Sequence, residues 1–172
     1  MDSFFAYMQR LELLAFFSGY ALVYTVVLFI AGSRPSGNNF KTRITSLLPF
    51  AYALVGVLYL GLQLKNLYPD YSIEHMHRAI QEPWLTIWGL LSILFWIPAL
   101  AKKPVLSLLH SLIFFILLLK DLFSQISAPT KDMVRNDMNV YTVSLLLNLA
   151  AIAFMVLQSF LYTRFKNRKL IK

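Results

Sequence analysis

Three residues that commonly bind metal ions lie within four positions of the chain: Glu74, His75 and His77, in the string EHMH. Imidazole and carboxylate groups are the usual ligands of zinc and related metals. On an α-helix, however, His75 and His77 point about 200° apart, so the two rings cannot readily hold one ion. Because the surrounding apolar spacing favours a helix, we expect no metal site here, and only an extended conformation would restore one.

The segment around this string has the pattern of a short amphipathic helix. Asp70 or Ser72 can cap its beginning, and Pro83 closes it. The apolar residues fall on one side of such a helix: Ile73, Met76 and Ile80. We therefore expect residues 72–81 to form a short helix that lies flat in the outer membrane interface.

His110 lies inside an apolar stretch, where an ionisable residue is a functional candidate. The alternative is a neutral histidine that is hydrogen-bonded to Ser107, to Ser111 or to a polar group of a neighbouring helix. A haem iron would usually need a second axial ligand at similar depth, and His75 and His77 are predicted to lie at the opposite membrane face. We expect neither haem nor another cofactor.

Two stripes of small and polar residues run along predicted spans. One stripe has successive spacings of 4, 3 and 4 residues: Tyr52, Gly56, Tyr59 and Gln63. The other is similarly aligned on one helix face: Ser144, Asn148, Ala151 and Met155. Such stripes are typical of seams where membrane helices pack, and the alternative is that they line a pocket.

Lys120 and Asp121 end an apolar stretch and are candidates for a proton or substrate path. The alternative is a solvated helix end from which Lys120 extends toward the surface. Asp121 is also grouped with Asp70, Glu74 and His75 as residues that chemistry at the outer interface would use. No carboxylate is predicted deep inside a span, which argues against a proton-driven pump acting alone.

Membrane spans are the elements that must position these residues. Of the 172 residues, 58% are hydrophobic and 14% are charged, which is too little polar surface for a water-soluble domain of this size. Five apolar stretches predict an all-α, polytopic membrane helical bundle in a single domain, residues 1–172. Their approximate bounds are 11–31, 44–64, 84–101, 104–123 and 140–162.

The beginning of the chain and its lack of cysteine further limit the classes of protein and of chemistry that fit the sequence. The start MDSFFAYMQRLE lacks the basic segment and cleavage site of a secretory signal peptide, so we expect the first span to be retained. The chain has no cysteine, which excludes disulfides and thiolate chemistry.

The apolar region 84–123 would be about 60 Å long as one helix, twice the thickness of the hydrocarbon core. Its middle contains Pro98, Lys102, Lys103 and Pro104. Each lysine would cost about 2.5 to 3.5 kcal/mol at the bilayer centre. We therefore predict two spans joined by a hairpin at the membrane surface.

The charged residues are segregated between the two predicted faces. The linker after the first span, the corner at Lys103 and the C-terminal tail hold ten Lys or Arg and no acid. The remaining segments hold six Lys or Arg and all eight Asp and Glu. Because positive charge marks the cytoplasmic side, we predict an outside N-terminus and an inside C-terminus. We expect the tail to lie against anionic lipid rather than to bind nucleic acid.

The functional expectations follow from the lack of a recognised catalytic or nucleotide-binding motif. The first is a non-catalytic subunit or scaffold of a larger complex in a bacterial inner membrane, in contact with membrane lipids and other membrane subunits. The second is a small carrier or binding protein for a lipid, quinone or other apolar ligand. The third is an enzyme that acts at the outer membrane interface.

Overall fold

The computed structural model describes residues 2–33, 38–80, 82–126 and 131–169, and every regular element in these ranges is helical. This confirms the all-α prediction. The elements in chain order are α1 (Asp2–Phe17), α2 (Tyr20–Ser33), α3 (Asn38–Leu67), α4 (Ile73–Ala79), α5 (Pro83–Leu91), the 3₁₀ helix η1 (Ser92–Trp96), α6 (Pro98–Ala101), α7 (Pro104–Ile126) and α8 (Lys131–Lys169).

Four helical segments of the described chain are long and apolar enough to cross a membrane. Their bounds are Gln9–Phe29, Thr42–Leu67, Pro104–Ser124 and Met138–Phe165. The predicted span 84–101 is different, because its apolar helical part, Pro83–Trp96, is shorter. The backbone of Ile97 is extended there and Pro98 begins a new short helix. The third predicted span is therefore a broken segment rather than one straight helix.

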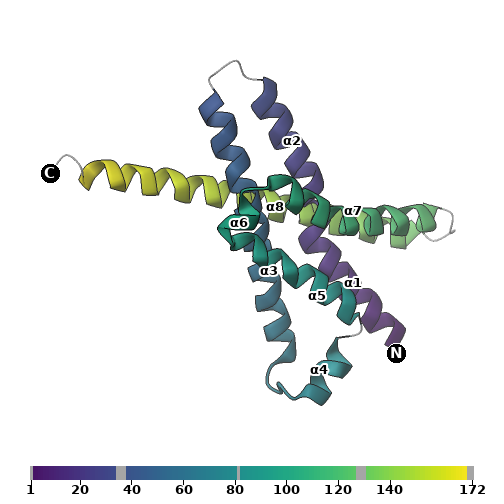
Figure 1. Ribbon diagram of the computed structural model, residues 1–172. Coiled ribbons are helices and arrows are strands. Elements are labelled where there is room, and N and C mark those ends of the chain that lie inside the picture. The colour runs from purple at the N-terminus through teal and green to yellow at the C-terminus, as the bar shows by residue number, and fades with distance from the viewer. Residues whose placement is uncertain (1, 34–37, 81, 127–130, 170–172) are drawn as a thin grey trace.

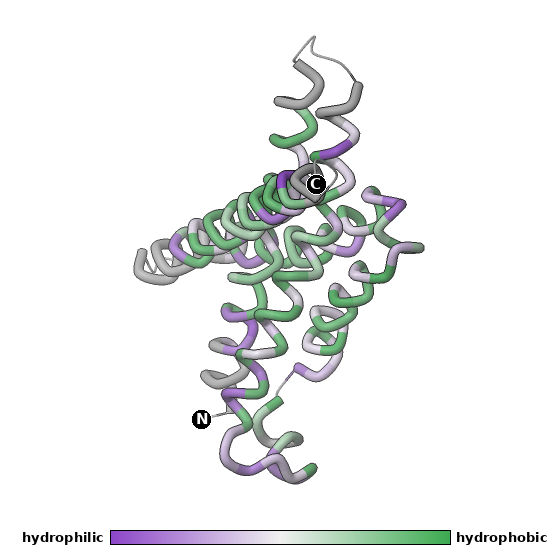
Figure 2. Tube along the Cα trace, turned by 90° about the vertical axis from the view of Figure 1, so that its left-hand side faces the viewer, coloured by the Kyte–Doolittle hydropathy of each residue, from purple (hydrophilic) through white to green (hydrophobic). Residues whose placement is uncertain are grey.

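The corner predicted near Lys103 separates two helices. α6 ends at Ala101 and α7 begins at Pro104, so the chain does not continue as one long helix. In Figure 1, α1, α2, α3 and α5 lie along roughly the same axis, with α3 running opposite to α1 and α2, whereas α7 and α8 lie across them and the C-terminal part of α8 extends away. Figure 2 shows hydrophobic residues along the middle of the helices, with hydrophilic residues mostly toward the helix ends.

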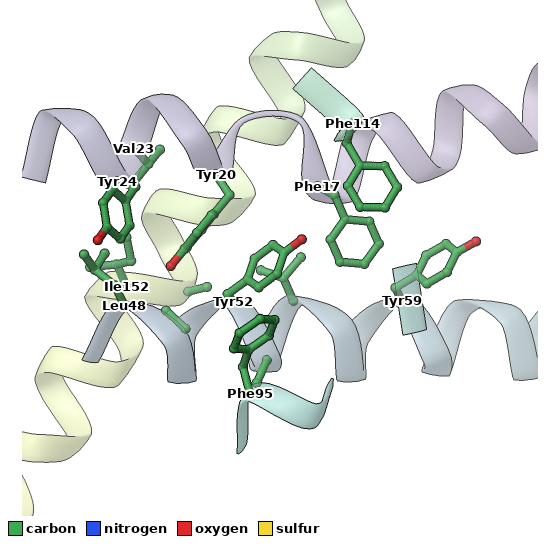
Figure 3. Packing of buried hydrophobic residues seen from close by; sticks show 14 of the residues in the cluster. Phe17, Tyr20, Val23, Tyr24, Leu48, Tyr52, Tyr59, Phe95, Phe114 and Ile152 are labelled. Carbon is green, nitrogen blue, oxygen red and sulfur yellow. The ribbon is translucent and has the colours of Figure 1, made fainter. Parts of the chain in front are cut away.

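Aromatic rings form the centre of the core where these two groups of helices meet (Figure 3). Phe17 of α1 stacks on Phe114 of α7 with a ring-centre distance of 4.9 Å. Tyr20 and Tyr52, from α2 and α3, lie 4.3 Å apart and are fully buried. The absence of a side chain at Gly56 lets η1 approach α3, because a Cβ there would lie 2.1 Å from the Ser92 hydroxyl.

A break between α1 and α2 is closed by side chains of α8. The Gly19 backbone N–H donates to the Ser144 hydroxyl at 2.8 Å, and the Asn148 amide donates to the Phe16 carbonyl at 2.9 Å. Backbone groups released by a broken helix need partners inside a membrane, where water cannot supply them. The predicted stripe on α8 is therefore a packing seam, with Ser144, Asn148 and Ala151 buried.

Candidate ligand-binding site

An apolar groove of about 340 Å³ runs between α4 and α5. Its lining residues are Ile73, Met76, Ile80, Pro83, Thr86, Ile87 and Leu90. The first three are the residues predicted to form the apolar face of α4. That face therefore lies along the groove, and a groove of this size is within the range of small-molecule sites.

A smaller polar pocket of about 140 Å³ adjoins the groove, and Ile80 lines both. Its lining residues come from the beginning of the α1 span, the end of α3 and the end of α4: Gln9, Glu12, Gln63, Asn66, Leu67, Ala79 and Ile80. Glu12 is the charged residue among them, and its carboxylate lies 3.5 Å from the Asn66 amide nitrogen. The groove is therefore apolar, whereas the adjoining pocket offers groups that can form hydrogen bonds.

Three buried polar atoms without a hydrogen-bond partner among the described residues lie along α3 and α5: Tyr59 Oη, Gln63 Nε2 and Thr86 Oγ1. Gln63 lines the polar pocket and is 7% exposed, whereas Thr86 lines the groove and is 3% exposed. The Tyr59 hydroxyl lies beside Thr86 without reaching hydrogen-bonding geometry. An unpaired buried polar group costs about 1–3 kcal/mol, so a ligand that supplied a partner would be favoured here.

Local hydrogen bonds hold the beginning of α4 and the beginning of α5 in place. The Ser72 side chain caps α4 by accepting the His75 backbone N–H at 3.2 Å, while Asp70 accepts the Ser72 backbone N–H at 2.9 Å. The Gln9 side chain accepts the Glu82 backbone N–H at 3.3 Å and so ties the start of α5 to α1. The helix predicted for 72–81 is confirmed over Ile73–Ala79, and Ile80 already has an extended backbone.

Outside this site, His110 belongs to the aromatic core. Its Nδ1 atom lies 2.8 Å from the Tyr52 hydroxyl of α3, and its ring stacks on Trp88 at 4.8 Å. The hydroxyls of Ser107 and Ser111 have other partners: they donate to the carbonyls of Pro104 and Leu108, and Ser107 also bonds the Tyr20 hydroxyl. The predicted alternative, a bond to a polar group of a neighbouring helix, describes this histidine.

The residues expected to act together at the outer interface are not brought together by the structure. Asp70, Glu74 and His75 lie at the beginning of α4, which is remote from α7 in Figure 1. Asp121 of α7 instead accepts a hydrogen bond from Arg10 of α1 at 2.9 Å. Lys120 is exposed. An enzyme built on Asp121 and the α4 residues therefore has no common centre.

The described residues contain no group of three His, Cys, Asp or Glu side chains able to hold a metal ion. His75 lies on α4, which is helical as the apolar spacing predicts. The side chain of His77 falls outside the described residues.

The sequence stripe on α3 identified part of this site, since Gln63 lines the pocket and Tyr59 lies beside Thr86 of the groove. Glu12, Asn66 and Thr86 were missed. A usable signal was present: Gln9 and Glu12 are three residues apart, as are Gln63 and Asn66, so each pair shares a helix face. Both pairs were predicted near the same membrane face, where they could have been expected to meet. Thr86 gave no comparable signal.

Comparison of the chain with protein-family models, with curated proteins and with solved structures finds no match.

Proposed function

We propose that this chain is a multi-pass membrane protein that binds an amphipathic, lipid-like molecule in the groove between α4 and α5. The groove itself carries the proposal, because its apolar walls adjoin a polar pocket and each is lined by a residue with a buried, unpartnered polar atom, Thr86 in the groove and Gln63 in the pocket. A molecule with an alkyl chain and a polar head matches both parts. This function corresponds to a small carrier or binding protein.

Site occupancy is tested with a photoactivatable long-chain alcohol added to membranes that contain the protein. We expect crosslinks on α4 and α5 peptides. Ile87 lines the groove and Leu91 of the same helix does not, so Ile87→Trp should fill the space and abolish crosslinking while Leu91→Trp leaves it unchanged. Equal crosslinking of the two variants would refute the site.

The proposal includes five crossings, an outside N-terminus and an inside C-terminus, in a bacterial inner membrane. The broken segment from α5 to α6 is then the third crossing, and the ten basic residues of the acid-free segments all face the cytoplasm. If that segment does not cross the membrane, the orientations of α7 and α8 in the membrane are reversed and the basic tail faces outward. Charge segregation favours the five-crossing arrangement.

Single cysteines at Tyr71, Lys103 and Asn167 distinguish the two topologies, because the chain has no native thiol. With five crossings, an impermeant thiol reagent applied to intact cells labels Tyr71→Cys alone. With four crossings, all three positions lie on one side and react alike. Permeabilised cells provide the control for intrinsic reactivity.

The second candidate function is a subunit of a larger membrane complex, and the exposure of α8 favours it. The C-terminal part of this helix extends away from the rest of the molecule (Figure 1), and its large apolar side chains, Phe160 and Phe165 among them, are exposed. Native mass spectrometry after mild extraction tests this role. A stoichiometric protein partner supports it, and a monomer that is fully stable alone contradicts it.

A further inference from the structure

The polar pocket beside the groove has a composition that selects among head groups. This inference rests on the proposed binding of an amphiphile. We propose that the pocket holds an uncharged, hydroxyl-bearing head, such as that of an alkyl glycerol, and that Glu12 is the residue that rejects anionic heads.

Hydrogen bonding in the pocket favours a head that bears hydroxyl groups. A carboxylate such as Glu12 only accepts hydrogen bonds, whereas the amide nitrogen of Gln63 only donates. The Gln63 residue lines the pocket, and its side-chain nitrogen is buried without a partner among the described residues. A hydroxyl group donates and accepts, so a head with two hydroxyls can satisfy both side chains. An ammonium head only donates and leaves the Gln63 nitrogen unpaired.

The charge of the pocket disfavours an anionic head. Glu12 is the charged residue among the described lining residues, and the pocket wall supplies no cation to balance a phosphate or carboxylate. The nearby Arg10 is paired with Asp121 at 2.9 Å, and Lys65 of α3 is exposed and does not line the pocket. An anionic head would therefore meet like charge without compensation, which is an effective means of rejecting a ligand.

The pocket is also held in shape without a ligand. Asn66 approaches the Glu12 carboxylate from α3, and Gln9 binds the backbone at the start of α5. The groove and the pocket share Ile80, so a chain lying along Ile87 and Leu90 continues toward the head site. The head and the chain thus have separate, adjoining places.

The test uses the full chain in nanodiscs, which avoids detergents with sugar heads, and measures displacement of the photoactivatable alcohol. The competitors share one dodecyl chain and differ in the head: dodecyl glycerol, dodecylamine and dodecyl phosphate. We expect dodecyl glycerol to compete at about tenfold lower concentration than dodecyl phosphate. Glu12→Gln should reduce this preference to about threefold or less by admitting the phosphate. Glu74→Gln makes the same charge change on α4 outside the pocket and should leave the preference intact.

The outcomes separate the two proposals. If no dodecyl compound displaces the probe, the binding function itself fails. If all compete equally with the unmodified protein, if the amine or phosphate competes best, or if Glu12→Gln keeps the full preference, then amphiphile binding stands and the head-group assignment is overturned.

Discussion

The helices before the corner at Lys103 and those after it are both apolar, but they are buried within the protein to different extents. In an apolar 18-residue stretch of each membrane-length segment, 56% of the stretch is buried within the protein for Gln9–Phe29 and 50% for Thr42–Leu67, whereas 22% is buried for both Pro104–Ser124 and Met138–Phe165. Hydropathy does not distinguish them, because all four segments are long and apolar enough to cross a membrane. Inside a bilayer, burial follows from close packing and hydrogen bonds rather than from hydrophobicity.

The two groups are joined by specific hydrogen bonds between helices. The Gly19 and Phe16 backbone groups bind α8, the Tyr52 hydroxyl binds His110 of α7, and Arg10 pairs with Asp121. The Tyr20 hydroxyl also hydrogen-bonds Ser107 of α7, and Arg43 of α3 donates to Ser159 and Thr163 of α8. Sensitivity to mutation should therefore concentrate at these contacts. The outward faces of α7 and α8 should tolerate apolar substitutions.

The largest effect is expected at Gly19, where α8 packs directly on the backbone. A Cβ at this position would lie 2.7 Å from the Ser144 carbonyl carbon and from the Leu145 nitrogen, so α8 must shift. We expect Gly19→Ala to lower the free energy of unfolding by about 3 kcal/mol, measured in mixed micelles. A Cβ at Gly61 would have nothing within 4 Å, so Gly61→Ala should be neutral or stabilise α3 by up to about 1 kcal/mol. Equal effects would contradict the close contact.

The next effect is expected at Asn148, which is 1% exposed. Asn148→Leu removes the donor to the Phe16 carbonyl and leaves that carbonyl unpaired at the break between α1 and α2. We expect a loss of about 1–2 kcal/mol by the same measurement. Leu149→Ala, at an exposed position on the neighbouring face of α8, is the control and should cost less. A neutral Asn148→Leu variant would mean that the break needs no support from α8.

The bond between Tyr52 and His110 is tested by a double-mutant cycle with Tyr52→Phe and His110→Phe. We expect a coupling energy of about 0.6 kcal/mol, since interhelical hydrogen bonds in membranes average that value. The matched cycle replaces Tyr52→Phe with Tyr59→Phe, which removes a hydroxyl without a partner among the described residues. Its coupling to His110 should be near zero. Similar coupling in both cycles would show that ring packing, not the hydrogen bond, joins the helices.

The ion pair between Arg10 and Asp121 should contribute least to joining α1 and α7. The side chains are 25% and 21% exposed, so solvent and salt screen the pair. We expect Asp121→Asn to cost about 0.2–1 kcal/mol and this cost to decrease at high salt. Lys120→Gln, which changes a neighbouring charge outside the pair, is the control. A cost independent of salt would contradict an electrostatic origin.

The sequence predicted the helical class, the separation of helices at Lys103 and most of α4, because each depends on a local pattern. Hydropathy identifies apolar stretches long enough to form membrane helices, and the prolines and lysines near Lys103 mark where one such stretch is interrupted. The spacing of Ile73, Met76 and Ile80 indicates one face of a helix. The break at Gly19 was not predicted, because it exists only with Ser144 and Asn148 of α8 in place. The candidate site was only partly predicted for the same reason. Glu12 and Thr86 belong to different helices, and no local pattern joins them.

The smallest expected effect concerns Asp70, which belongs to neither packed group and acts on α4 alone. Hydrogen bonds from the Ser72 backbone N–H and hydroxyl hold the pKa of the Asp70 carboxyl below its usual value. A carboxyl whose folded pKa is lowered stabilises the structure above its unfolded pKa, and this contribution is lost as the pH falls through the folded pKa. We therefore expect the amides of α4, corrected for intrinsic exchange, to lose some protection from hydrogen exchange as the pH falls below about 4. Asp70→Asn should remove this dependence, whereas Glu74→Gln should keep it. Because α4 forms one wall of the groove, crosslinking of the photoactivatable alcohol should weaken over the same pH range. Crosslinking that stays constant while hydrogen-exchange protection falls would show that the groove does not depend on the stability of α4.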